Sequence, residues 1–377
     1  MDFGLSDDQL LLQRSAAEFL ASECPASLVR EVARDEEGFP RGLYRHMAEL
    51  GWLGLIVPDT YGGAGLSFLD LVLLLEQLGR AVVPGPFFSS AVLATLAIML
   101  GGTSAQRQAW LPRLAAGDAV GTLAWLEASD RLDPAGVAAR ARKSGKAYRL
   151  SGQKLFVTDA HVADVIVAAF RSAGRGEEGV TLFLLPRDAP GVTIKPLPSI
   201  DLTRRPMEVR FEDVELPAAA VLGAEHKGWK TLARLFDAAA VALAADSLGG
   251  AERALELAVD YAKVREQFGR ASGSFQAVKH IAAEMVSEIE PARSLLWYAA
   301  YACDSVPRDA ARAASMAKAC LSDVYSHTTN RAVQIHGGIG FTWEHDLHFW
   351  FKRAKWNEFA FGDATYHRER LAQLAKF

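Results

Sequence analysis

The sequence predicts an α+β protein with an N-terminal α-helical domain, a middle antiparallel β-barrel or sandwich domain, and a C-terminal four-helix bundle. Two observations predict this order. Apolar residues recur with a helical period at both ends of the chain, and short β-rich runs separated by turn residues fill the middle. The changes in pattern set the predicted domains at residues 1–118, 119–224 and 225–377.

The composition is that of an ordinary globular protein. Of the 377 residues, 50% are hydrophobic and 23% are charged, and the formal net charge is −4. This charge gives no general electrostatic reason to bind nucleic acid. The most apolar region, about residues 69–100, is interrupted by Glu76, Arg80, Pro84 and Pro86, so no membrane insertion is expected.

The start of the chain and its cysteines favour a cytoplasmic location. Met1-Asp2-Phe3 is followed by acidic residues instead of the basic and apolar segments of a signal peptide. The cysteines are widely spaced and odd in number, so neither a disulfide framework nor a zinc site is predicted; they are Cys24, Cys303 and Cys320.

The first block predicts helices joined by loops. Ser6, with Gln9 three residues later, is a candidate capping box for the first helix. The apolar residues that follow it, and those at 71–78, recur with a helical period. The turn-rich loop VPDTYGGAGLS (57–67) separates two helices.

The middle block predicts strands without intervening helices, which favours an antiparallel sheet. Its β-rich runs are separated by glycine, proline and acidic turns; they are AYRLSGQKLFVTDA (147–160), DVIVAAF (164–170), GVTLFLLP (179–186), GVTIKPL (191–197) and MEVRFEDVEL (207–216).

The last block predicts the bundle. Four long periodic stretches joined by short loops run over residues 229–268, 274–303, 309–336 and 345 to the end. The first is free of proline and would be roughly 60 Å long as a straight helix.

The segment YAKVREQFG (261–269) has two readings. In the structural reading Gly269 is the helix C-cap and Arg265 complements the helix dipole. In the functional reading the planar guanidinium of Arg265 binds a phosphate.

The segment VQIHGGIGFTWE (333–344) also has two readings. Its glycines either end a helix, or let backbone N–H groups approach an anion without Cβ obstruction. It is not a dinucleotide-fold fingerprint, because no strand precedes it.

The histidines near this segment raise the question of a metal site. His345 and His348 are three residues apart, close to His336, Glu344 and Asp346. No second pair at ligand spacing supports them, so no metal is predicted and solvated residues at a helix start are favoured.

Together these segments resemble the acyl-CoA dehydrogenase family over essentially the whole chain. The resemblance rests on the α–β–α order, F-V-T at 156–158, R-E-Q-F-G at 265–269, F-Q at 275–276 and Q-I-H-G-G-I-G-F at 334–341. It implies an FAD flavoprotein in which a carboxylate removes the α-proton of an acyl-CoA thioester. The β-hydrogen leaves as hydride to flavin N5.

The resemblance also implies binding residues and partners. Phe156 and Thr158 would contact the flavin ring region. The adenine and pyrophosphate of the FAD of an adjacent subunit would be held by Arg265, Phe268, Gln276, Gln334, Ile335, His336, Gly337 and Gly338, so FAD binding would need at least a dimer. The implied partners are an acyl-CoA substrate and an electron-transfer flavoprotein as acceptor.

Two departures from the family pattern concern the site itself. The family's Thr-Glu-Pro-Gly-x-Gly-Ser-Asp-type loop is matched by LEASDRLDP (126–134), which keeps Glu127 but lacks the threonine and the glycines. The family's Tyr-Glu-Gly-Thr pattern, aligned through R-A-K (353–355), falls on residues 360–363, so Phe361 holds the glutamate position. The second family location for the glutamate, on the first bundle helix, holds Ala239 and Ala240.

Three readings follow for the segment KWNEFAFGDATYHRER (355–370). Asp363 is a displaced catalytic base; or the chain is the small, base-deficient subunit of a heteromeric enzyme for dicarboxylic, steroid side-chain or other bulky acyl-CoAs; or it is a homo-oligomer with altered chemistry or none, such as a binding protein. The second reading is favoured, with a paralogous partner supplying the glutamate. Glu358 is expected to be a helix-surface charge, and His367 has no assigned role.

Overall fold

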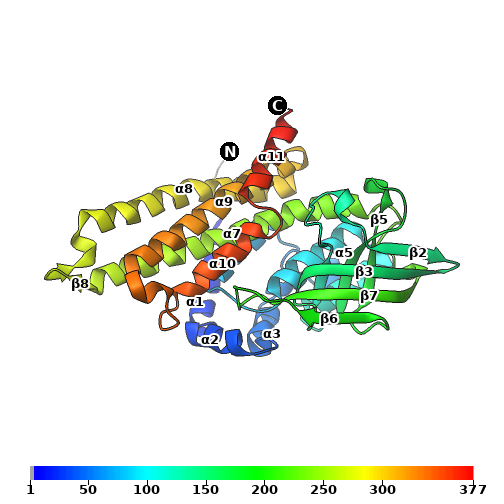
Figure 1. Cartoon of the computed structure of the whole chain (residues 1–377), viewed down its shortest axis with the longest axis horizontal. Helices are drawn as coiled ribbons and strands as arrows, with labels where there is room; N and C mark the ends of the chain where they lie inside the picture. The colour runs from blue at the N-terminus through cyan, green and yellow to red at the C-terminus, as the bar shows by residue number, and fades with distance from the viewer. Residues whose placement is uncertain (1–3, 377) are drawn as a thin grey trace. The chain divides into compact units, whose positions relative to one another are not determined.

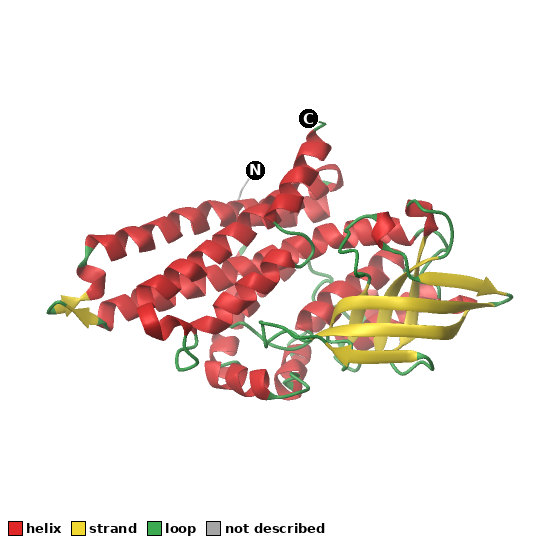
Figure 2. Cartoon of the chain, viewed as in Figure 1, coloured by secondary structure: helices red, strands yellow, loops and turns green. Residues whose placement is uncertain are grey.

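The computed structural model describes residues 4–376 and confirms the predicted fold class. Helices occupy both ends of the chain and the β-sheet occupies the middle (Figures 1 and 2). By internal contacts the chain forms two compact units. Unit 1 comprises the described parts of Met1–Glu31, Ser67–Val83 and Asp237–Phe377, and unit 2 comprises Val32–Leu66 and Pro84–Phe236. No helix within residues 4–376 combines the length and the apolar character needed to span a bilayer.

The N-terminal helices begin where the sequence offers caps. Ser6 accepts a hydrogen bond from the Gln9 N–H while Gln9 accepts one from the Ser6 N–H, so the predicted capping box is confirmed. The helical elements of this region are α1 (Asp7–Glu23), α2 (Ala26–Arg34), α3 (Arg41–Glu49), η1 (Trp52–Gly54), η2 (Asp59–Tyr61), α4 (Phe68–Arg80), the π-helix η3 (Phe87–Ala94), α5 (Thr95–Gly101) and α6 (Ser104–Ala115).

The middle strands of residues 4–376 form one seven-stranded sheet in the order β1-β4-β2-β3-β7-β6, with β5 paired to β4. Most pairs are antiparallel, but β4 runs parallel to β1 and β2. Edge-to-face aromatic contacts of Phe170 with Phe183 and Phe211 lie in its core. The strands are β1 (Gly121–Ala124), β2 (Arg140–Ser144), β3 (Ala147–Thr158), β4 (Val165–Arg171), β5 (Val180–Pro186), β6 (Val192–Pro196) and β7 (Pro206–Pro217), with the short helices η4 (Pro134–Gly136), η5 (Glu177–Gly179) and η6 (Ala218–Ala220).

The C-terminal bundle differs from the prediction at two places. The first long helix ends at Val264, so Gly269 is not its C-cap but part of the turn of a short hairpin, where Phe268 and Gly269 both have positive φ. The fourth helix is broken at residues 360–363, where Phe361 and Gly362 also have positive φ. The elements are α7 (Gly228–Val264), β8 (Glu266–Gln267), β9 (Arg270–Ala271), η7 (Ser272–Ser274), α8 (Gln276–Ser305), α9 (Pro307–His336), η8 (Gly337–Phe341), α10 (Leu347–Phe359) and α11 (Ala364–Ala375).

Helices α4 and α7 touch backbone to backbone inside unit 1. A Cβ at Gly249 would overlap the Glu76 carbonyl oxygen, and one at Gly79 would overlap the Asp246 carbonyl oxygen. The two glycines therefore allow a helix crossing that larger residues would force apart.

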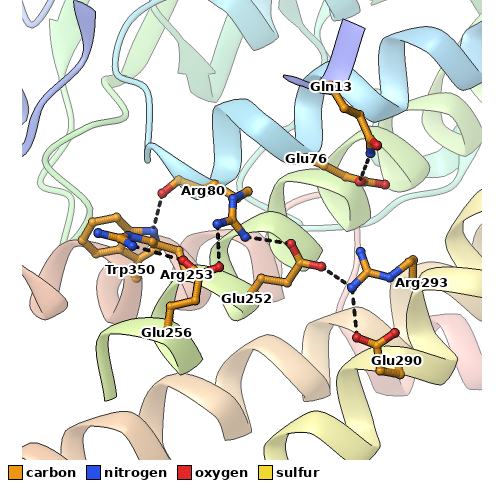
Figure 3. A network of polar contacts seen from close by, with 9 residues as sticks. All are labelled: Gln13, Glu76, Arg80, Glu252, Arg253, Glu256, Glu290, Arg293 and Trp350. Carbon is orange, nitrogen blue, oxygen red and sulfur yellow. Dashed lines mark hydrogen bonds and ion pairs between the residues drawn. The ribbon is translucent and has the colours of Figure 1, made fainter. Parts of the chain in front are cut away.

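Ion pairs surround this crossing (Figure 3). Arg80 of α4 pairs with Glu252 at 2.9 Å and with Glu256 at 2.6 Å, and the Arg80 carbonyl accepts the Trp350 indole N–H. Glu252 also pairs with Arg293 of α8. The network links α4, α7, α8 and α10.

Candidate functional site

The turn between α10 and α11 carries Phe361, where the resembling family carries its base. Phe361 has φ +58° and Gly362 has φ +97°, so two consecutive residues adopt the left-handed region. Phe361 is half-buried and Gly362 is buried. A non-glycine residue pays a conformational cost in that region, so the surrounding contacts must hold the turn.

Lys318 of α9 supplies most of these contacts. Its Nζ donates to the carbonyl oxygens of Asn357 at 2.7 Å, Glu358 at 3.1 Å and Gly362 at 2.8 Å. The first two carbonyls lie in the last turn of α10, where carbonyl groups have no intrahelical donor. Burial lowers the pKa of Lys318 to about 7, against the attraction of Asp363 and Glu358. The amine thus fastens both sides of the turn.

His367 of α11 holds the same turn. Its Nε2 lies 3.0 Å from the Phe361 carbonyl oxygen, which can only accept, so this nitrogen carries the proton. Burial, with the nearby Lys318 charge, lowers the pKa of His367 to about 4, so the ring is neutral at pH 7. His367, which the sequence left without a role, is therefore a structural partner of Phe361.

Asp363 and Glu358 both have local partners. Asp363 is the N-cap of α11 and accepts the Tyr366 N–H at 2.7 Å. Glu358 accepts from Ser326 and Lys355, each at 2.8 Å, so it is more than a free surface charge. Helix capping alone explains the presence of Asp363, whose assignment as a base stays a prediction.

The second family location for the base is apolar. Ala239 and Ala240 are completely buried in α7. The nearby Asp237 pairs with Arg370 of α11 at 2.6 Å, and burial raises its pKa. Its carboxylate is therefore committed to an ion pair.

In unit 2, the end of β3 presents the two predicted flavin contacts. Phe156 has φ +54° and is 51% exposed, whereas Thr158 is buried and its carbonyl accepts a hydrogen bond from Thr122 of β1 at 2.5 Å. The strand thus ends in an irregular segment that turns one aromatic ring outward. Exposure of a large apolar ring fits a bound planar group.

A buried ion pair behind this strand was not predicted. Lys154 has no exposed side-chain surface and donates to Glu127 at 2.6 Å, and burial lowers its pKa to about 8. Glu127 also accepts the backbone N–H groups of Ala138 and Ala139. The glutamate kept by the loop 126–134 therefore anchors both ends of this segment to the sheet.

The predicted adenine and pyrophosphate residues lie in the β8–β9 hairpin with the segment just before it, at the start of α8, and at the end of α9 with η8. We call this part of unit 1 the hairpin end. Phe268 is 92% exposed, and a Cβ at Gly337 or Gly338 would meet nothing within 4 Å. The exposed residues of the set are Arg265, Phe268, Gln276, Gln334, Gly337 and Gly338. Ile335 lines a neighbouring cavity of about 400 Å³.

This donor set fits the nucleotide end of FAD. It offers a guanidinium for phosphate, amides for polar edges, an aromatic ring for stacking and bare glycine backbone. His336 differs from the rest: it is buried, stacks on Tyr261 with ring centroids 4.5 Å apart, and bonds the Ala332 carbonyl. His336 therefore supports the neighbouring backbone from inside and is not exposed to a ligand.

The histidines near the hairpin end pack against aromatic rings. The ring of His336 lies 4.5 Å from that of His345, and Trp343 lies 4.5 Å from His348. Burial lowers the pKa of His348 to about 4. Residues 4–376 contain no group of three or more His, Cys, Asp or Glu side chains placed to hold a metal ion.

Comparison with protein families covers almost the entire chain. Residues 6–118 match the model of the acyl-CoA dehydrogenase N-terminal domain, residues 122–214 that of the middle domain, and residues 226–375 that of the C-terminal domain.

Individual relatives give the same result. The chain is 32% identical over 383 residues to "Probable acyl-CoA dehydrogenase YngJ" of Bacillus subtilis, covering 100% of both chains. A chain of the structure "Electron transferring flavoprotein of Acidaminococcus fermentans: Towards a mechanism of flavin-based electron bifurcation" superposes with a TM-score of 0.93 at 33% identity, covering 100% of this chain and 99% of that one. A chain of the ChsE4-ChsE5 complex from Mycobacterium tuberculosis superposes with a TM-score of 0.90 at 28% identity, covering 100% of both.

Proposed function

The chain belongs to the acyl-CoA dehydrogenase family of FAD-dependent oxidoreductases, and from this premise we propose that it is the base-deficient subunit of a heteromeric acyl-CoA dehydrogenase. The observation that carries the proposal is Phe361. It lies in a turn that Lys318 and His367 hold firmly, yet its side chain cannot accept a proton. The hydrogen bonds of Lys318 and His367 hold the turn although position 361 carries no carboxylate.

The partner would supply the missing glutamate. FAD, when bound, would supply the acceptor for the β-hydride, and the glutamate of a paralogous subunit would take the α-proton. This chain's exposed Phe268, Arg265 and glycine backbone at 337–338 would complete the nucleotide part of the partner's FAD site. The similarity to a chain of the ChsE4-ChsE5 complex supports a heteromeric assembly.

The remaining assignments belong to the same proposal. Phe156 and Thr158 would contact the flavin ring region, and the proposed domain division is at residues 1–118, 119–224 and 225–377. An electron-transfer flavoprotein is the acceptor, which the similarity to a chain of such a structure supports. A cytoplasmic location is supported by the free state of Cys24, Cys303 and Cys320.

The test compares the lone chain with the assembled enzyme. The chain is purified alone and together with a glutamate-bearing paralogue, each is loaded with FAD, and loss of flavin absorbance is followed after adding acyl-CoAs that include bulky ones. We expect bleaching only with the paralogue. Robust bleaching by the lone chain that Asp363→Asn abolishes would overturn the proposal in favour of Asp363 as the base.

A gain of function tests the role of position 361 directly. In the lone, FAD-loaded chain, Phe361→Glu is expected to raise the bleaching rate by about 10²–10⁴-fold, the usual contribution of a placed general base. Phe361→Gln is the matched control, because the glutamine side chain has nearly the same shape as glutamate but carries no carboxylate. Equal rates for the Glu and Gln variants would show that more than the base is missing.

A further inference from the structure

A buried polar contact within unit 2 joins the π-helix η3 to the end of β3. The Ser89 hydroxyl oxygen lies 2.6 Å from a carboxyl oxygen of Asp159, the residue directly after β3. The two residues are 0% and 2% exposed. A buried hydroxyl or carboxyl group costs free energy unless it is hydrogen-bonded, so each of these groups depends on the other.

Asp159 directly follows the strand end that carries the two predicted flavin contacts, Phe156 and Thr158. Phe156 and Asp159 have φ +54° and +58°, so the backbone leaves the extended conformation at both residues. Aspartate tolerates this left-handed region better than most residues, because its short side chain can form local hydrogen bonds. The Asp159 N–H donates to the Arg205 carbonyl at 2.8 Å, which fixes the main chain just after the strand. The position of the strand end therefore depends on contacts from other elements.

Helix η3 supports the same strand end by a second route. π-Helices are rare and frequently lie at functional sites, and all of η3 is buried. The Ser90 hydroxyl accepts the Gly121 N–H at 3.1 Å, where β1 begins. The next residue of β1, Thr122, donates its hydroxyl to the Thr158 carbonyl at 2.5 Å. Two successive serines of η3 thus hold the end of β3, one directly and one through β1.

The contact between Ser89 and Asp159 does not require one protonation state. Burial raises the pKa of Asp159, opposed by the Ser89 hydroxyl and by the charge of Arg204. An ionised carboxylate accepts the proton of the Ser89 hydroxyl. A protonated carboxyl group can instead donate to the Ser89 oxygen, and the hydroxyl then donates to the Pro86 carbonyl oxygen, 3.2 Å away. The hydrogen bond therefore holds the same geometry in both states.

We propose that Ser89 and Asp159 are positioning residues for the flavin, which they align through the end of β3 that carries Phe156 and Thr158. Groups that contact a cofactor act only when their place is fixed, and supporting hydrogen bonds from rigid elements fix it. The proposal rests on the proposed function in taking Phe156 and Thr158 as flavin contacts. It involves neither Phe361 nor the glutamate of the partner.

The test measures the flavin itself, in the FAD-loaded protein alone and with its glutamate-bearing partner. Ser89→Ala is expected to raise the Kd for FAD about tenfold, as loss of a hydrogen bond to a carboxyl group predicts, and to shift the visible absorption band of the flavin. Asp159→Asn should keep the Kd within about twofold of the wild type, because asparagine retains an acceptor oxygen for Ser89 and tolerates positive φ.

Thr95→Val is the matched control for a merely structural effect. Thr95 is buried, and its hydroxyl donates to the Ser90 carbonyl at 2.9 Å within the helical segment. Valine keeps the shape of threonine and removes one buried hydrogen bond, as Ser89→Ala does. We expect both variants to lower the thermal stability by similar amounts, and only Ser89→Ala to change the flavin spectrum and the Kd for FAD.

Three outcomes would overturn the proposal. If Ser89→Ala changes thermal stability but neither the spectrum nor the Kd for FAD, the pair only stabilises unit 2. If Asp159→Asn loses as much FAD affinity as Ser89→Ala, the charge of Asp159 acts instead of the hydrogen bond. If the effects of Ser89→Ala and Asp159→Ala on the Kd add in the double variant, the two residues act independently.

Failure of this inference is distinguishable from failure of the proposed function. A protein that bleaches only with its partner, and whose flavin is the same in all these variants, would overturn the positioning pair and leave the base-deficient subunit intact. Changes in the flavin spectrum of a lone chain that bleaches through Asp363 would do the reverse.

Discussion

At the scale of single residues, Lys318 carries an unusual combination of burial and hydrogen bonding. Lys318 is 1% exposed, and its Nζ lies within hydrogen-bonding distance of three main-chain carbonyl oxygens and of the Ser322 hydroxyl. Buried carbonyls without a donor are costly, so the amine stabilises the turn by satisfying them. The backbone at Phe361 thus depends on a side chain more than forty residues away in sequence.

Removing this amine should loosen the turn. We expect Lys318→Met to destabilise the protein by about 2–4 kcal/mol, because three carbonyls lose their donor. The loss should grow as the pH rises from 7 to 10.5, since the unfolded chain then holds a proton that the folded chain does not. Urea unfolding at several pH values measures both effects.

Lys355, in the same region, provides the control. It is half-buried and its amine pairs with the Glu358 carboxylate at 2.8 Å, so Lys355→Met should change the free energy of unfolding by less than about 1 kcal/mol. If both substitutions lowered the free energy of unfolding by similar amounts, the hydrogen bonds of Lys318 to the carbonyls would not be what stabilises the turn.

At the scale of elements, helix α4 carries a buried carboxylate. Glu76 is 1% exposed, and it accepts hydrogen bonds from the Trp297 indole at 2.8 Å and from the Gln13 amide at 3.2 Å (Figure 3 shows the latter). Burial raises its pKa to about 8, with Glu252 adding to the shift and Arg293 opposing it. The acid therefore holds a proton at neutral pH where α1, α4 and α8 meet.

The pH dependence of stability follows from this shift. Between pH 4.5 and pH 8 the folded chain binds a proton at Glu76 that the unfolded chain has lost, so stability falls as the pH rises through this range. Glu76→Gln keeps an acceptor for Trp297 and cannot ionise. We expect this variant to gain stability relative to the wild type from pH 5 to pH 8.5, as measured by thermal unfolding.

Glu290 offers a comparison within the network of Figure 3. It pairs with Arg293 at 3.1 Å but is mostly exposed. Glu290→Gln should leave the pH dependence as it is in the wild type. If Glu76→Gln follows the wild type across the same range, the pKa of Glu76 is not raised.

The elements also show what local sequence can and cannot predict. The capping box of Ser6 and Gln9 was predicted correctly, because both partners lie within one helical turn. The break in the fourth helix was missed, because Phe361 adopts positive φ, which sequence rarely signals for an aromatic residue. Lys154 pairs with Glu127 over 27 residues of sequence, and no local pattern marks such a partner.

At the scale of the whole molecule, unit 1 exposes three large aromatic side chains, one in the β8–β9 hairpin and two in the segment that follows α9. Phe268, Phe341 and Trp343 are 92%, 72% and 55% exposed. Exposed aromatic groups of this size mark interaction surfaces in soluble proteins. Phe268 is three residues from Arg265 in the sequence and Phe341 is three residues from Gly338, so we expect a change in assembly through these rings to affect the predicted FAD residues as well.

Substitution of Phe268 distinguishes an effect on the stability of the lone chain from an effect on FAD binding in the assembled enzyme. We expect Phe268→Ala to change the free energy of unfolding of the lone chain by less than about 0.5 kcal/mol, because the ring contacts little of its own chain. The same change should lower the FAD retained by the assembled enzyme several-fold, as loss of an interface aromatic does. FAD content after gel filtration gives the result.

Leu374→Ala serves as the matched control, because this side chain is also exposed but lies on α11, outside the predicted FAD residues. It should leave FAD content unchanged. A loss of FAD in both variants would point to a general effect of removing exposed apolar surface.

The composition of unit 1 determines when the protein can fold during synthesis. Unit 1 joins residues 67–83 to residues beyond 236. Within it the backbones of α4 and α7 are in contact at Gly79 and Gly249. The ribosome releases α4 more than 150 residues before that partner, whereas the sheet of unit 2 is complete by then. Helix α1, which packs against α4, is already made by then, but α7 and α8 are not, so we expect part of the apolar surface of α4 to stay exposed in the nascent chain until they emerge; its buried leucines are Leu71, Leu73, Leu74, Leu75 and Leu78.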